Sequence, residues 1–225
     1  MDFIDGVTLN DDMWEGITPE AKTKIYDKLG EQLRLLRSIP PPHPSFYGRV
    51  NNQGYHPFGM VVGHGKHVAG PFHTYRAFLE YAITTLEYRL VDRCVNKPIG
   101  CSGKIDPIVQ LLASNFFQNL EDTSGSGEPK FSHMDIKLDN IMLVPSASNP
   151  SDRIEDHDLW LIDWEYSCWL PAWAEAAGCL RRLPGSDTEE RLLPQWRMSR
   201  EGIKPFYWGQ AGFWMSCCGY LGGTL

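Results

Sequence analysis

The spacing of apolar residues along the chain predicts several helices. Thr18–Glu20 is a helix-start signal, and apolar side chains then recur at helical spacing until the prolines at 40–42 stop the pattern. Thr74 is placed to cap a second helix, and Asp106–Pro107 to begin a third. Because the apolar residues of these segments fall along one side, we expect the helices to pack on a common core.

Short strands are predicted near the start of the chain and around residue 150. Residues 1–9 alternate apolar and polar side chains, which favours a strand whose hydrogen-bonding partner lies elsewhere or is absent from this chain. Two apolar runs, Ile141–Val144 and Leu159–Ile162, are separated by the polar insert Pro145–Asp158. This is the pattern of a two-stranded hairpin with an enlarged loop. The expected fold class is therefore α+β and mainly α-helical.

Three stretches lack a clear period. Residues 43–73 are rich in Gly, Pro, His and Asn and predict a long ordered loop. Surface or hydrogen-bonded histidines are expected there rather than a metal site, because no Cys or carboxylate stands at ligand spacing from His56, His64, His67 and His73. Residues 123–127 predict a flexible connection, and the tail after about residue 180 is aromatic and partly helical.

Composition narrows the classes of function. With 225 residues, 42% of them hydrophobic, the chain can bury one sizeable core as a single domain. The formal net charge of -7 argues against a nucleic-acid partner and is compatible with a cationic ligand. Six cysteines without a CxxC pair favour reduced thiols. Since neither a long apolar run nor a signal peptide is evident, we expect a cytoplasmic protein without a membrane partner.

The residues that carry chemistry stand at the two ends of the predicted hairpin. Asp135 and Asn140 lie five positions apart immediately before its first strand, and Asp163 follows its second. If the strands pair in register, the hairpin brings these three side chains toward one point. Mg²⁺ prefers oxygen ligands, so a carboxylate and an amide oxygen can hold the ion while another carboxylate orients a hydroxyl. The sequence therefore predicts a magnesium and phosphate site.

Two motifs in this region resemble those of a known family. His133–Asn140 resembles the H-x-D-x-x-x-x-N catalytic loop shared by protein kinases and aminoglycoside or choline phosphotransferases. Leu161–Glu165 resembles the metal-binding I-D-x-E segment of the small-molecule branch. Residues 1–6 resemble its hinge strand, residues 35–40 the end of the first C-lobe helix of its fungal-type members, and residues 165–175 the segment after the metal site. The resemblance covers residues 1 to about 180.

The resemblance to the aminoglycoside phosphotransferase-like family, which has the protein-kinase-like fold, implies roles for the central residues. Asp135 would accept or align the proton of the acceptor hydroxyl, while Asn140 and Asp163 would hold Mg²⁺ on the phosphates of ATP. The hairpin would then carry both the catalytic and the metal-binding loops. The nucleotide hinge would be formed by Asp2, Phe3 and Ile4.

Three further residues receive supporting roles from the same resemblance. His133 would brace the catalytic loop through hydrogen bonds. Lys137 either contacts the transferring phosphate or is an ordinary exposed lysine. Glu165 either supports the metal or closes the turn.

The resemblance also predicts the domain organisation. Residues 1–10 would form the hinge-like strand and residues 11–225 a single C-terminal lobe, without the N-terminal lobe that supplies a glycine-rich loop and a lysine for ATP. The functional hypothesis is an ATP-dependent phosphotransferase that moves the γ-phosphate to a hydroxyl of a small molecule. The alternative is an inactive, truncated kinase-like remnant that acts as a binding or interaction module.

Overall fold

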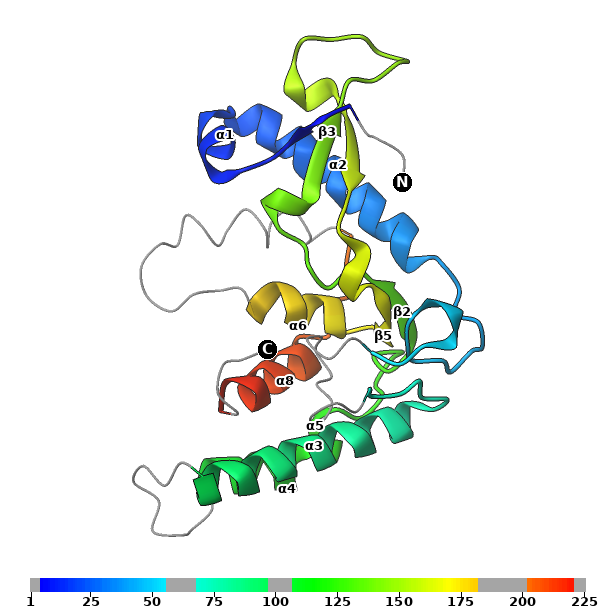
Figure 1. The fold of residues 1–225 in the computed structure, drawn as a ribbon, viewed down its shortest axis with the longest axis vertical. Coiled ribbons are helices and arrows are strands. Elements are labelled where there is room, and N and C mark those ends of the chain that lie inside the picture. The colour runs from blue at the N-terminus through cyan, green and yellow to red at the C-terminus, as the bar shows by residue number, and fades with distance from the viewer. Residues whose placement is uncertain (1–4, 56–67, 97–106, 182–201, 221–225) are drawn as a thin grey trace.

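The structure is a computed structural model that describes residues 5–55, 68–96, 107–181 and 202–220, and it combines helices with two small antiparallel sheets (Figure 1). The helices are α1 (Asp11–Gly16), α2 (Pro19–Arg37), α3 (Tyr75–Asn96), α4 (Pro107–Ser114), α5 (Phe116–Asn119), α6 (Ala174–Arg181) and α8 (Trp208–Tyr220). The strands are β1 (Val7–Thr8), β2 (Pro129–Ser132), β3 (Ile141–Val144), β4 (Asp158–Leu161) and β5 (Cys168–Pro171). Single 3-10 turns occur at η1 (Val50–Asn52), η2 (Leu138–Asn140), η3 (Ile154–Asp156) and η4 (Trp164–Tyr166).

The predicted hairpin is present and belongs to a three-stranded sheet. β3 and β4 pair antiparallel, with Ile141 opposite Leu161 and Val144 opposite Asp158. β1 adds to the other edge of β3, with Val7 opposite Leu143. The partner of the first strand therefore lies within this chain. Leu159 and Leu161 are buried and alternate with exposed residues along β4, so one face of the sheet is turned to the core.

Helix α2 covers the core side of this sheet, as its apolar stripe predicts. Its first residue follows Thr18, whose hydroxyl accepts a hydrogen bond from the Ala21 amide at 3.3 Å, and it ends before the prolines that were expected to stop it. Ile25, Leu29 and Leu33 are fully buried along one side. Figure 1 shows α2 running beside the β3–β4 hairpin, and the buried side chains of helix and sheet belong to one apolar cluster.

Aromatic side chains form the part of the core that lies among α3, α6 and α8. Trp173 is fully buried, and its ring lies 5.2 Å from that of Trp214 on α8. Phe78 on α3 contacts both indoles. The described part of the tail, residues 202–220, is thus an integral part of the core, although its pattern alone suggested only partial helicity.

The prediction of a flexible connection at residues 123–127 is wrong. Ser126 is fully buried, and its hydroxyl accepts a hydrogen bond from the Thr123 amide at 2.9 Å. The hydroxyl of Tyr47 donates to the carbonyl of Gly127, and that of Tyr207 donates to the carbonyl of Ser124 at 3.0 Å. Residues 123–127 form a packed turn, because two distant tyrosines add hydrogen bonds to those that the turn makes within itself.

The sequence patterns also failed to predict helix α1, which a local cap stabilises, and strand β2, which a distant strand stabilises. Helix α1 begins after Asn10, whose side chain accepts a hydrogen bond from the Met13 amide at 2.9 Å. Strand β2 pairs with β5, so that Phe131 lies opposite Trp169. Neither strand has a partner near it in sequence, which is why their pairing could not be anticipated.

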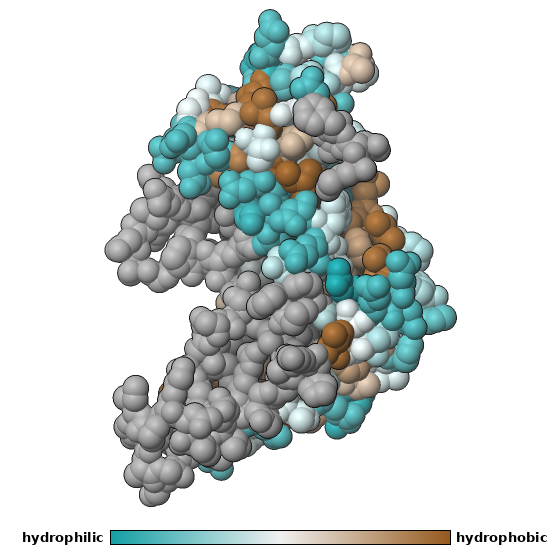
Figure 2. All heavy atoms as spheres, viewed as in Figure 1, coloured by the Kyte–Doolittle hydropathy of each residue, from teal (hydrophilic) through white to brown (hydrophobic). Residues whose placement is uncertain are grey.

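The described surface is of mixed polarity, and the described cysteines include three buried thiols. On the face shown in Figure 2, the described residues form a mixed surface in which small hydrophobic groups lie among hydrophilic ones. Cys168, Cys179 and Cys217 are free thiols in the buried core. Of the helices in the described ranges, none has both the length and the apolar run that crossing a membrane requires.

The loop between β3 and β4 is tied to α2 by two lysines of different burial. Lys28 Nζ donates to the carbonyl oxygens of Glu155 at 2.9 Å and of His157 at 2.5 Å, in a partly buried position. Lys24 Nζ pairs with Asp156 at 3.0 Å, but half of its side chain is exposed. The polar insert is therefore anchored mainly through Lys28.

We predict that Lys28→Met lowers the free energy of unfolding by about 1–3 kcal/mol, because two partly buried carbonyls lose a charged donor. Lys24→Met is the matched control and should cost less than about 1 kcal/mol, as is usual for exposed ion pairs. Urea denaturation of both variants measures the difference. Equal losses would show that Lys28 does not anchor the loop.

Candidate functional site

The register of the hairpin brings its two candidate loops together. Asn140 directly precedes β3, and Asp163 follows the end of β4 by two residues. The amide of Ile162 donates to the carbonyl of Asn140 at 3.0 Å, which continues the pairing of Ile141 with Leu161 beyond the strands. Asp163 is the residue after Ile162, so this hydrogen bond also holds the backbone of Asp163 near Asn140.

Asp135 and Asn140 are joined through their side chains and are both almost fully buried. Asn140 Nδ2 donates to the Asp135 backbone oxygen at 2.9 Å and to its Oδ2 at 2.7 Å. Lys137 Nζ lies 3.1 Å from the same Oδ2. The Asp135 carboxylate is therefore fixed in orientation and compensated in charge, which a buried carboxylate requires.

His133 is fully buried and connects this loop to the end of β4. Its Nδ1 accepts a hydrogen bond from the Asp135 amide at 3.3 Å, so the proton of a neutral ring lies on Nε2, which is 3.0 Å from the carbonyl oxygen of Ile162. The ring of Trp164 lies 5.0 Å away. These hydrogen bonds join the loop at Asp135 to the backbone at the end of β4.

Glu175 on α6 supports the same loop, and sequence reasoning gave it no role. Its carboxylate accepts hydrogen bonds from the His133 amide at 2.7 Å and from the Met134 amide at 3.1 Å. Met134 has a left-handed backbone (φ 66°), which costs free energy in a residue with a side chain. Two charge-assisted hydrogen bonds, which these amides donate to a carboxylate that is 1% exposed, offset that cost.

A positive charge lies near Glu175 in the same buried layer. Arg37, at the end of α2, donates from Nη2 to the carbonyl of Ala172 at 2.9 Å. Burial lowers the pKa of the Arg37 guanidinium from its ordinary value, and the Glu175 carboxylate opposes this shift. An acid within the apolar segment Trp173–Ala177 was the signal that could have revealed this buried carboxylate.

Asp163, two residues after the end of β4, is exposed to solvent. Its backbone is left-handed, with φ 61° and ψ 68°, and none of the described residues donates a hydrogen bond to its carboxylate. This conformation carries a steric cost in a residue with a side chain. Glu165, in the turn η4 that follows, is also exposed. Both alternatives for Glu165 therefore stay open.

The donor atoms present fit a magnesium ion better than a softer metal. Because Nδ2 of Asn140 is directed at Asp135, its Oδ1 is the atom left for a cation, and Asp163 supplies a carboxylate. In the described ranges, no group of three or more His, Cys, Asp or Glu side chains is placed to hold a metal. An ion here would depend on these two oxygen ligands together with phosphate oxygens and water.

Several predicted residues cannot be placed. The hinge residues Asp2, Phe3 and Ile4 lie outside the described residues, as do His56, His64 and His67. Lys137, by contrast, is described: it is partly exposed and paired with Asp135.

Comparison with known proteins gives one match. A family model described as the phosphotransferase enzyme family matches residues 1–214. No curated protein and no solved structure matches the chain. The matched region extends past residue 180, where the pattern of the tail allowed no assignment, and includes the first half of α8.

We predict that Glu175→Gln destabilises the fold by about 2–4 kcal/mol, because one of the two buried amides then faces a donor and the buried charge is lost. Asp139→Asn, an exposed acid in the same loop, is the control and should change stability by less than about 0.5 kcal/mol. Denaturant unfolding followed by tryptophan fluorescence measures both. A Glu175→Gln variant as stable as the control would contradict the bracing role.

Proposed function

Since the chain belongs to the phosphotransferase enzyme family, we propose that it transfers the γ-phosphate of ATP to a hydroxyl group of a small molecule. The observation that supports this most directly is the buried pair of Asp135 and Asn140, held next to the backbone of the segment that carries Asp163. Phosphoryl transfer depends on positioning and on charge stabilisation more than on covalent chemistry. A rigid group of oxygen ligands at one end of a hairpin suits that requirement.

Asp135 is the proposed residue that aligns the acceptor hydroxyl and accepts its proton. Its carboxylate is held by Asn140 and Lys137, so its orientation is fixed before the substrate arrives. A positioned carboxylate of this kind contributes to proton transfer only when the acceptor lies within hydrogen-bond reach. The bracing of its loop by His133 and Glu175 serves that positional requirement.

Asn140 and Asp163 are the proposed ligands of Mg²⁺. When bound, the ion neutralises charge on the transferring phosphate and orients it. The exposure of Asp163 leaves its carboxylate accessible to an ion that arrives with the nucleotide. The left-handed backbone of Asp163 fixes the direction of its Cα–Cβ bond.

The outer face of the sheet is the proposed surface for the nucleotide base. Met142 and Trp160 are opposite each other across β3 and β4, and Trp160 is half exposed. A Cβ at Gly6 would lie 2.9 Å from side-chain atoms of Met142 and Val144, so the chain passes close to this face. A flat apolar surface beside the end of the hairpin suits a planar base.

We predict that Asp163→Asn weakens Mg²⁺-dependent binding of ATP at least about tenfold, because the ion loses a charged ligand. Asp135→Asn should change the affinity for ATP by less than about twofold. The same variant should reduce phosphoryl transfer roughly 100-fold or more, measured as the slow transfer of phosphate to water. Asp139→Asn is the control for both measurements. Calorimetry and a phosphate-release assay distinguish the variants, and a wild-type chain that fails to bind millimolar Mg²⁺–ATP would overturn the proposal.

Lys137 allows a test of its own, because ATP and ADP differ only in the γ-phosphate. If Lys137 contacts that group, Lys137→Met should weaken binding of a non-hydrolysable ATP analogue about tenfold and change ADP binding by less than about twofold. Lys130→Met, which removes a partly exposed lysine paired with Glu128, is the matched control. If Lys137→Met changes the affinities for the ATP analogue and for ADP equally, Lys137 supports Asp135 and does not contact the γ-phosphate.

A further inference from the structure

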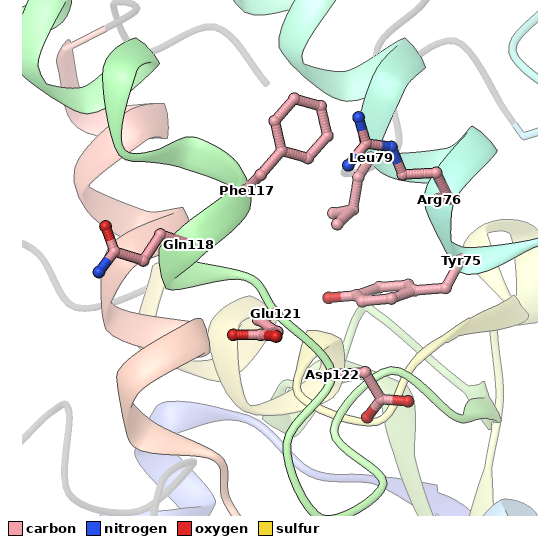
Figure 3. A pocket seen from close by; sticks show the side chains of 7 residues that line it. All are labelled: Tyr75, Arg76, Leu79, Phe117, Gln118, Glu121 and Asp122. Atoms are coloured by element: carbon pink, nitrogen blue, oxygen red, sulfur yellow. The ribbon is translucent and has the colours of Figure 1, made fainter.

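A second concave site lies outside the catalytic loop. It is a pocket of about 420 Å³ formed where the start of α3 meets α5 and the turn after it (Figure 3). Its volume lies within the range of small-molecule sites. Figure 3 shows the rings of Tyr75 and Phe117 and the side chain of Leu79 around one open space, with Glu121 at its lower side. Nothing in the proposed phosphoryl transfer makes use of it.

Tyr75 and Arg76 line the pocket, and their polar groups already interact with other residues of the protein. The Tyr75 hydroxyl donates to the carbonyl of Leu120 at 2.7 Å and accepts from Trp173 Nε1 at 3.0 Å. The guanidinium of Arg76 lies 3.9 Å above the ring of Phe117. Its Nε donates to Glu80 at 2.8 Å, so its charge is paired. Arg76 covers one face of the Phe117 ring and Tyr75 stacks on Phe78, so the two rings offer a ligand only their remaining apolar surface.

The two acids of the pocket differ in their engagement. Asp122 Oδ1 accepts hydrogen bonds from the Gly127 amide at 2.9 Å and from the Ser126 hydroxyl at 3.4 Å, and so belongs to the packed turn. The carboxylate of Glu121 has no partner among the described residues. Its backbone is nevertheless fixed, because its carbonyl oxygen accepts from Ser126 and from Gln210, each at 3.3 Å. An unpaired negative charge thus stands on a rigid support at the edge of an aromatic cavity.

We propose that this pocket binds a small organic cation, a protonated amine carried on an apolar chain or ring. Its ammonium group lies against Glu121, and its apolar body fills the space between Tyr75 and Phe117. A carboxylate and aromatic faces together favour an amine over a neutral or anionic molecule of the same shape. The acidic balance of the whole chain, at -7, acts in the same direction.

The pocket is separate from the proposed phosphoryl-transfer site. Strand β2 runs from the packed turn beside the pocket to His133, and its four residues span roughly 13 Å. A cation bound in the pocket is therefore a second ligand, distinct from an acceptor beside Asp135. The inference does not rest on the proposed function.

The test compares three molecules of similar shape and different charge: phenethylamine, 2-phenylethanol and 3-phenylpropionate. Binding to the full chain is measured at pH 7 by changes in protein NMR spectra. We expect the amine to bind at least about fivefold more tightly than the alcohol and the carboxylate to bind weakest. Equal affinities for amine and alcohol, or binding of none of the three, would overturn the proposal.

Variants locate the site. Glu121→Gln keeps the size of the side chain and should reduce amine affinity about fivefold, to the level of the alcohol, without changing the alcohol. Glu31→Gln, an exposed acid on α2, is the control and should leave all three affinities unchanged. Asp135→Asn should also leave amine binding unchanged, so a failure of the phosphotransferase proposal is recognised separately. Unaltered amine binding by a folded Glu121→Gln variant would remove the pocket from consideration.

Discussion

Antiparallel pairing of β3 with β4 sets Asn140 beside Ile162, and the candidate catalytic groups are held relative to that pair. A shift of one residue in this register would turn Leu159 and Leu161 outward and separate the two loops. The register is fixed by burial, because Ile141 and Leu143 must face the apolar side of α2. The same contacts that form the core therefore determine the geometry of the proposed site.

The loop that carries Asp135 adopts a costly conformation that buried charge stabilises. Met134 has a left-handed backbone. Its amide and that of His133 both donate hydrogen bonds to Glu175, which lies on a helix more than forty residues later in the sequence. Arg37 brings a third element, α2, into the same buried layer. Removal of one partner from such a group leaves an unpaired buried charge, which costs more than the interaction itself contributes. Stability and the positioning of Asp135 are for this reason linked.

The two proposed sites differ in how their ligands are recognised. Beside the hairpin, oxygen atoms of Asn140 and Asp163 suit a hard cation and phosphate. In the pocket by α3 and α5, ring faces and the carboxylate of Glu121 suit a soft organic cation. Strand β2 joins the two places, with the packed turn at one end and His133 at the other.

The sequence alone determined the local elements and pointed to the residues of the candidate site. Helix α2 with its Thr18 cap, the β3–β4 hairpin and the order of Asp135, Asn140 and Asp163 follow from period and spacing, which act over a few residues. Tertiary structure alone decided the pairing of β2 with β5, the packed turn at 123–127 and the support of the loop by Glu175. In each of these, a hydrogen bond joins residues far apart in the chain, so its energy has no local signature. Only the complete fold brings donor and acceptor together.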